Sequence, residues 1–322
     1  MVRNRITGLI LTLIFFAACG PKEKSSAVEE ISDSPMEVAV SDLSPYLLSI
    51  SEAENAANID SYVFIDLRKK EAFQTGHIPG ARAVWRPDIQ NLDLPYGGMR
   101  ATKESLAELM GKLGISSEKK IVIYDEKGNV DAARLWWMLQ LYGHEESYLF
   151  NGGLTTWKNA SLPLEMKDPV YSAAVFEFTG EGKSDWIAEK EEVLEFSRKK
   201  AGVLLDTRSE KEFTGEEMKN GAFRAGHIPG AQWIDYVYAI QYDGNQEFLG
   251  LDELTQVYAS LGESKDTPII VYCQSGVRSA HTTFVLRELL GCRNVKNYDG
   301  SWIEWSYFNE LPIAAVSKDT PQ

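Results

Sequence analysis

The chain has 322 residues, of which 44% are hydrophobic and 25% are charged, so it is long enough for two globular domains with ample cores. Its formal net charge of −14 argues against nucleic acid as a partner, because neutralising phosphates requires a basic surface.

The first nineteen residues predict an export signal. Arg3 and Arg5 precede a mostly apolar stretch over residues 6–18, which is shorter than the ~20 residues that a membrane-spanning helix needs. The stretch ends in small residues before Cys19 and is similar to the lipobox of bacterial lipoproteins, in which this cysteine is acylated. Phe16 departs from that pattern, because leucine is more usual there.

We therefore expect residues 1–19 to be a lipoprotein signal peptide. A lipid on Cys19 would anchor the exported protein to a bacterial membrane, on the periplasmic side or on the outer surface. The alternative is an ordinary cleaved signal with an incidental cysteine. Residues 20–45 are polar and acidic, and they are expected to form a flexible tether.

Four blocks of sequence occur twice, in the same order and at offsets of 140 to 150 residues. The pairs are 63–73 with 203–213, 76–81 with 226–231, 121–130 with 269–278, and 151–157 with 299–305. The second pair is the identical hexapeptide GHIPGA. The chain is therefore predicted to hold a duplicated domain. We expect a first domain, a linker and a second domain at 46–162, 163–184 and 185–316.

Each half is predicted to be an α/β domain. In the second half, residues 201–206 and 268–273 are short apolar runs typical of buried strands. Residues 251–262 and 279–290 have the apolar spacing of helices, and each ends at or before a glycine. Such alternation predicts a mostly parallel sheet with helices on both faces. Ligands of such sheets bind beyond the carboxyl ends of the strands, where Cys273 stands.

Cys273 lies between a buried strand and a helix, and this setting predicts a nucleophile. A disulfide with Cys292 is excluded because the intervening helix would separate the two by ~20 Å, against less than ~7 Å between the Cα atoms of a disulfide. A metal site is disfavoured by the lack of CxxC and of histidines at ligand spacing. A structural cysteine is the remaining alternative, but the N–H groups of the helix start and Arg278 would favour the thiolate.

The tandem D-x-R and GHIPGA blocks, the cysteine with its glycine-centred loop, and the sequence YDGSWIEW together resemble the two-domain rhodanese family of sulfurtransferases. The resemblance covers residues 45–316. It implies two tandem rhodanese-like domains, of which the first is inactive because Asp125 stands at the cysteine position. It also implies that the second carries sulfur as a persulfide, with no metal or organic cofactor, in the loop Cys273, Gln274, Ser275, Gly276, Val277 and Arg278. Related phosphatases have a C-x5-R loop that is one residue longer, so phosphatase or arsenate reductase activity is the weaker interpretation.

The resemblance leaves two sulfur donors open. Thiosulfate enzymes have loops that resemble CRKGVT, whereas 3-mercaptopyruvate enzymes resemble CGSGVT, whose serine joins a histidine and an aspartate of the first domain. The loop here, CQSGVR, matches neither. Arg278 partly replaces the cations of the first type, and Ser275 with His77 and Asp66 fits the second. The second half carries the same histidine and aspartate, so a structural role for His77 and Asp66 is the alternative. Loops of the CQSGVR type are common in bacterial thiosulfate enzymes, and thiosulfate is favoured.

Three arginines are further candidates for substrate binding. Arg224 matches an arginine that binds the donor carboxylate in bacterial mercaptopyruvate enzymes. Arg208 is expected to pair with the aspartate of its D-x-R block and alternatively to contact the donor, and Arg86 is expected to line the cleft between the domains. Glu212 stands where thiosulfate enzymes carry a donor-binding arginine, which places that contact in doubt.

The favoured function is transfer of sulfane sulfur from thiosulfate to a thiophilic acceptor, cyanide or a small thiol. The expected partners are thus a small-molecule donor and acceptor, together with the membrane. Two other classes remain open: a persulfide carrier that delivers sulfur to a protein, and a non-catalytic binding or sensory module. The intact loop at Cys273 argues against the last.

Overall fold

The computed structural model describes residues 40–315, in which the strands form two sheets of five strands each. All strand pairs within these sheets are parallel. The first sheet has the order β1-β5-β4-β2-β3 and the second has the order β6-β10-β9-β7-β8, so the second repeats the first. The predicted fold of two tandem α/β domains is confirmed. The predicted signal peptide, most of the tether and Cys19 lie outside the described residues.

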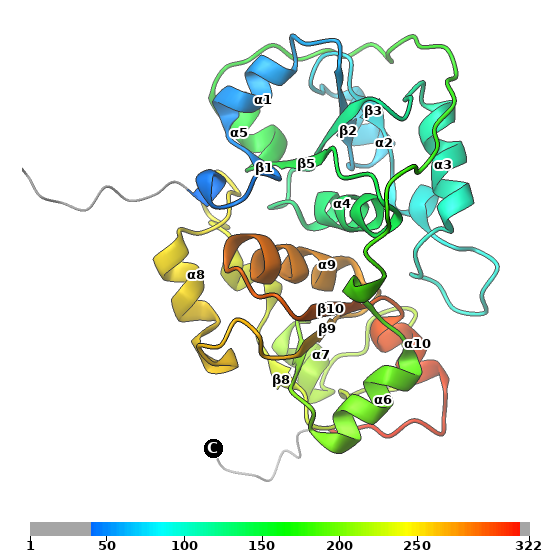
Figure 1. Cartoon of the computed structure of the whole chain (residues 1–322), viewed down its shortest axis with the longest axis vertical. Coiled ribbons are helices and arrows are strands. Elements are labelled where there is room, and N and C mark those ends of the chain that lie inside the picture. The colour runs from blue at the N-terminus through cyan, green and yellow to red at the C-terminus, as the bar shows by residue number, and fades with distance from the viewer. Residues whose placement is uncertain (1–39, 316–322) are drawn as a thin grey trace, which may run out of the picture. The chain divides into compact units, whose positions relative to one another are not determined.

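Strands and helices alternate along the chain (Figure 1). The strands are β1 (Leu47–Leu48), β2 (Tyr62–Asp66), β3 (Arg82–Ala83), β4 (Lys120–Tyr124), β5 (Ser147–Phe150), β6 (Ile187–Ala188), β7 (Val203–Asp206), β8 (Gln232–Trp233), β9 (Ile269–Tyr272) and β10 (Val295–Tyr298). The α-helices are α1 (Ile50–Ala56), α2 (Lys70–Gln74), α3 (Lys103–Lys112), α4 (Val130–Tyr142), α5 (Gly153–Asn159), α6 (Lys190–Lys199), α7 (Glu210–Thr214), α8 (Leu251–Val257), α9 (Val277–Phe284) and α10 (Ser301–Tyr307). Helix α9 continues into a π-helical turn, Val285–Leu289.

Both faces of the first sheet are buried. In β4, Ile121 and Ile123 belong to one apolar cluster, whereas Val122 and Tyr124 belong to another. This alternation follows from the two-residue period of a strand. One cluster lies within the first domain alone, and a matching cluster lies within the second.

The third cluster is shared by the two domains. Helices α4 and α9 pack side by side in it (Figure 1). Trp136 of α4 meets Phe284 of α9 edge to face, with ring centroids 4.7 Å apart. An aromatic pair of this geometry contributes about 1 kcal/mol beyond the area that it buries. The halves are therefore joined by a continuous core.

Each domain also extends a loop to the other. The first arm, residues 90–100, and the second arm, residues 240–248, are each closed by an antiparallel bridge between their end residues. The Arg100 N–H donates to Asp299 in the turn after β10, at 3.0 Å. The Phe248 N–H donates to Asn151 in the turn after β5, also at 3.0 Å. The arms are thus exchanged: the first arm binds the turn after β10 of the second domain, and the second arm binds the turn after β5 of the first domain.

Candidate active site

Cys273 follows the last residue of β9, at the carboxyl end of a parallel strand. Its side chain is fully buried. Because the sequence predicts the nucleophile here, we call residues 273–278 the catalytic loop. Gly276 precedes α9 in the left-handed conformation, with φ 75°. A Cβ atom there would lie 2.6 Å from Nη1 of Arg134 and 2.7 Å from the carbonyl oxygen of Asp299, so only glycine fits this bend.

The turn after β10 fixes the shape of the catalytic loop. The Ser301 hydroxyl accepts the N–H groups of Cys273 (3.1 Å) and Gly276 (3.0 Å), and it donates to the carbonyl oxygen of Tyr298 at 2.7 Å. The Trp302 N–H donates to the Cys273 carbonyl at 2.9 Å. Ser301 itself has a left-handed φ of 52°, an unusual conformation for a residue with a side chain. Sequence reasoning did not single out Ser301, although serine replaces Gly153 of the first repeat.

Several groups act on the Cys273 thiol. Burial by itself raises its pKa, because the thiolate is desolvated. The charge of Arg278, the Ser279 hydroxyl 3.5 Å from the sulfur, and the N–H groups of Ser275 and Ser279 oppose that effect. These contributions outweigh burial, so the pKa of Cys273 lies below its ordinary value of 9.0. A buried thiol with a lowered pKa is suited to nucleophilic attack and to carrying an anionic persulfide.

Arg278 is held in place by Glu212. Its two terminal nitrogens donate to the two carboxylate oxygens at 2.7 and 2.8 Å. Burial raises the pKa of Glu212, but Arg278 and Ser209 more than offset this and bring the pKa to about 2. From the sequence, Glu212 was noted only because it replaces the donor-binding arginine of thiosulfate enzymes. The structure shows that it is the partner of the loop cation.

The first domain lacks both members of this ion pair. Ala72 aligns with Glu212, and Val130 aligns with Arg278. In place of a thiol, Asp125 projects its carboxylate into its own loop. There it accepts four backbone N–H groups at 2.8 to 3.2 Å, those of Lys127, Asn129, Asp131 and Ala132. Burial and the charge of Asp131 raise the pKa of Asp125 to about 6, against these N–H groups. The first domain therefore has the same loop, filled by a carboxylate that cannot carry sulfur.

The first arm borders the catalytic loop. A Cβ atom on Gly98 would lie 2.6 Å from Cβ of Ser275, so the arm covers this side of the loop. The Tyr96 hydroxyl donates to Glu304 of the second domain at 2.8 Å. On another side, the Gln274 amide donates to the carbonyl of Asn220 at 3.4 Å. The site is thus built from both domains.

The structure does not join His77 and Asp66 to Ser275. The His77 ring stacks on Phe73, with centroids 3.6 Å apart. Its Nδ1 lies 3.0 Å from the Phe73 carbonyl oxygen, and its Nε2 has no hydrogen-bond partner among the described residues. The Asp66 carboxylate is bound by Arg68 at 2.8 Å. A relay through these residues is therefore not formed.

The second domain repeats the same contacts. The His227 ring stacks on Phe213, and its Nδ1 lies 2.8 Å from the Phe213 carbonyl oxygen. Arg208 pairs with Asp206 at 2.6 Å and donates to the carbonyl of Gly226 at 2.8 Å. The alternative that the histidine and aspartate are structural parts of each repeat is supported, and the predicted local ion pair of Arg208 is confirmed.

Arg224 and Arg86 also bind within the protein. Arg224 donates to backbone carbonyls near the C-terminal end of the described chain, those of Trp305, Ser306, Phe308 and Leu311, at 2.7 to 3.0 Å. Arg86 pairs with Asp131. These contacts fix the two side chains to their own domains, and a contact with the donor stays a prediction for both.

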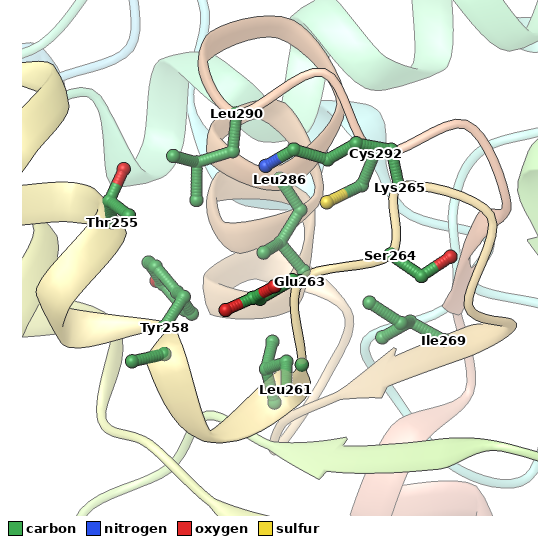
Figure 2. A pocket seen from close by; sticks show the side chains of 12 residues that line it. Thr255, Tyr258, Leu261, Glu263, Ser264, Lys265, Ile269, Leu286, Leu290 and Cys292 are labelled. Carbon is green, nitrogen blue, oxygen red and sulfur yellow. The ribbon is translucent and has the colours of Figure 1, made fainter.

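A second free thiol lies in a different setting. Cys292 lines a cavity of about 420 Å³ with Leu286, Leu290 and Lys265 (Figure 2). Ile269, the first residue of β9, also lines it, so the cavity lies at the opposite end of this strand from Cys273. Burial raises the pKa of Cys292 despite Lys265 and Arg287. Cys292 is therefore a poor nucleophile. In residues 40–315, no three His, Cys, Asp or Glu side chains are grouped to bind a metal ion.

Known proteins share this architecture. Residues 49–160 and 189–307 each match the model of the rhodanese-like domain. The chain is 39% identical over 252 residues to the sulfur carrier protein TtuD of Thermus thermophilus, covering 75% of this chain and 86% of TtuD. It is 38% identical over 252 residues to a thiosulfate sulfurtransferase of Corynebacterium glutamicum, covering 75% and 80%. The solved structure of SseA, a 3-mercaptopyruvate sulfotransferase of Escherichia coli, superposes with a TM-score of 0.70 at 28% identity, covering 80% and 98%.

The Arg278→Gln substitution should raise the pKa of Cys273, because it removes the cation that favours the thiolate. The rate of iodoacetamide alkylation against pH, followed on the Cys273 peptide by mass spectrometry, gives this pKa. The double variant R278Q/E212Q is the matched control, since it leaves no buried carboxylate without its cation. It should show a smaller increase, and an unchanged midpoint in both variants would contradict the role of Arg278.

Proposed function

Because the chain belongs to the rhodanese-like family of sulfurtransferases, we propose that it transfers sulfane sulfur from thiosulfate to a thiophilic acceptor through a persulfide on Cys273. The observation that carries this proposal is the buried Cys273 thiol, whose pKa is lowered at the mouth of a six-residue loop. An intact loop of this kind argues against a non-catalytic binding module.

Each half of the cycle is a displacement at sulfur. The Cys273 thiolate attacks the outer sulfur of thiosulfate and forms a new S–S bond. The old S–S bond breaks, and sulfite leaves with the electron pair. The acceptor then attacks the outer sulfur of the persulfide, so that cyanide becomes thiocyanate and the Cys273 thiolate is regenerated. The N–H groups and Arg278 stabilise the anionic sulfur in both states, as an oxyanion hole stabilises oxygen.

Two observations favour thiosulfate over 3-mercaptopyruvate. The cation of Arg278 acts on the sulfur of Cys273, which suits the dianion thiosulfate better than mercaptopyruvate, whose single charge lies on its carboxylate. The relay expected for mercaptopyruvate is not assembled, because His77 contacts Phe73 and Asp66 binds Arg68. The C. glutamicum relative supports the same donor. Mercaptopyruvate stays the alternative because SseA has the same fold at 28% identity.

A protein acceptor is a second candidate. TtuD is a sulfur carrier and is 39% identical to this chain. The same persulfide on Cys273 would then pass its outer sulfur to a thiol or another nucleophile of a partner protein. The chemistry of the first half-reaction is unchanged, and only the acceptor differs.

The Cys273→Ser substitution should abolish sulfur transfer, because serine is not a thiolate and forms no persulfide. The matched control is Cys292→Ser, which should keep wild-type activity since the pKa of that thiol is raised. Thiocyanate formation from thiosulfate and cyanide is the assay, and mass spectrometry of the donor-treated protein shows whether one sulfur atom is added at Cys273. Activity retained in C273S would refute both the enzyme and the carrier proposals.

With cyanide as acceptor, kcat/KM for thiosulfate should exceed that for 3-mercaptopyruvate by about tenfold or more. Ser275→Ala should leave the thiosulfate value within about twofold, because no relay through this hydroxyl is present. A higher value for mercaptopyruvate, together with a selective loss of that activity in S275A, would reverse the assignment of the donor.

We also propose that a lipid on Cys19 anchors the protein to a bacterial membrane. The basic start, the apolar stretch over residues 6–18 and the small residues before Cys19 support this. In residues 40–315 there is no helix long and apolar enough to cross a membrane. On cell fractionation, Cys19→Ser should either leave the membrane fraction or remain as the precursor with its signal peptide uncleaved. Labelling with a radioactive fatty acid should be lost. Unchanged labelling in C19S would disprove this anchor.

A further inference from the structure

Arg134 connects the inactive domain to the catalytic loop. It lies in the first half of α4, beside α9 (Figure 1), and its side chain is almost completely buried. Its guanidinium lies over the ring of Trp137, 5.3 Å from the centroid. No step of the proposed sulfur-transfer cycle requires this cation. Its position near the catalytic loop therefore needs another explanation.

The guanidinium contacts three segments around the site. Nη1 lies 2.5 Å from Oδ1 of Asp299 and donates to the carbonyl of Gly276 at 3.3 Å. Nη2 donates to the carbonyl of Gly98 in the first arm at 3.1 Å. Gly276 is the bend of the catalytic loop, and Asp299 stands two residues before Ser301, which binds the loop N–H groups. Arg134 therefore joins the bend, its supporting turn and the arm.

Asp299 requires this support. It is buried, and burial alone would raise the pKa of its carboxylate. Arg134 and Arg100 more than offset burial and hold the pKa below its ordinary value. Arg100 binds the other oxygen through its backbone N–H and its side chain, at 3.0 and 2.9 Å. Both cations come from the first domain. Removing one would leave a buried charge incompletely compensated next to the loop.

The equivalent contact, in which the second arm binds the turn after β5 of the first domain, involves no charged side chain. Asn151 aligns with Asp299, and Thr282 aligns with Arg134. Asn151 receives a backbone N–H from Phe248 in place of two arginines. The charged version of the exchanged-arm contact is thus found where the loop carries a thiol, and the neutral version where the loop is inactive. Joining the domains does not by itself demand this asymmetry.

We propose that Arg134 is a positioning residue for sulfur transfer, through which the inactive domain sets the geometry of the catalytic loop. It acts on Gly276 directly and on the N–H groups of the loop through Asp299 and Ser301. This inference rests on the proposed function of Cys273 and assigns a role to the first domain in it. Small displacements of groups that stabilise a reacting centre cost up to about a hundredfold in rate.

The test is Arg134→Met in the full chain, with Arg134→Lys as the conservative variant. Arg82→Met is the matched control, because Arg82 also stacks on an aromatic ring and donates to a carbonyl, but entirely within the first domain and linker. We expect R134M to lower kcat for thiosulfate by about tenfold or more, with a smaller change in KM. R134K should recover most of the loss, and R82M should match the wild type. A kcat of R134M within about twofold of wild type would overturn the proposal.

Alkylation of Cys273 provides a readout that does not depend on turnover. A displaced loop holds its N–H groups less well against the sulfur, so the midpoint of the pH dependence should increase in R134M and not in R82M. If the wild type shows no sulfur transfer, the proposed function fails while this measurement still decides the role of Arg134. An unchanged midpoint in R134M would then count against it.

Should R134M fail to fold, the double variant R134M/D299N carries the test. It removes both charges and recreates the asparagine of the first domain, so it leaves no uncompensated carboxylate. We expect it to unfold at a temperature close to that of the wild type and to keep the loss in kcat. Wild-type kcat in the double variant would show that Arg134 only compensates a charge, and the positioning role would be rejected.

Discussion

In both domains, backbone N–H groups converge in the loop between a buried strand and a helix. These groups need a hydrogen-bond acceptor, and this requirement determines how both loops are organised. In the first domain the acceptor is internal, since the Asp125 carboxylate takes four of these N–H groups. In the second domain the same position holds sulfur, whose anion the N–H groups favour. The same backbone arrangement can therefore bind the carboxylate of its own aspartate permanently, or it can accept and release an anionic sulfur.

The difference between the loops extends beyond one residue. Burial opposes the thiolate of Cys273, so the N–H groups are supplemented by Arg278, which Glu212 holds by two hydrogen bonds. The first domain has Val130 and Ala72 at these positions, because an aspartate needs no cation to be ionised near neutral pH. The thiol, its cation and the carboxylate that orients the cation are thus present together or absent together.

Much of this was predictable from the sequence, since it depends on local patterns. The strand–loop–helix around Cys273 and the D-x-R ion pairs each lie within a few residues, and the repeats can be found by aligning the two halves of the sequence. The pair of Arg278 with Glu212 and the support from Ser301 were not predicted, because they join segments far apart in the chain through the strand order. Arg224 is a further example: the motif predicts a donor contact, and it gave no sign that the guanidinium also binds the carbonyls of Trp305, Ser306, Phe308 and Leu311.

Contacts from the first arm and from α4 give the first domain a part in the site of the second. Asp299 belongs to the turn that binds the catalytic loop, yet the cations that neutralise it, Arg100 and Arg134, belong to the first domain. Without that domain, the buried carboxylate of Asp299 would stand without its cations next to Gly276 of the loop, and an uncompensated buried charge is strongly destabilising. The apolar surface of α9 that packs against α4 would also be exposed to solvent. The sulfur chemistry proposed for the second domain and the buried cations of the first therefore belong to one folded unit, in which the copy without a thiol supplies positive charge to the copy that has one.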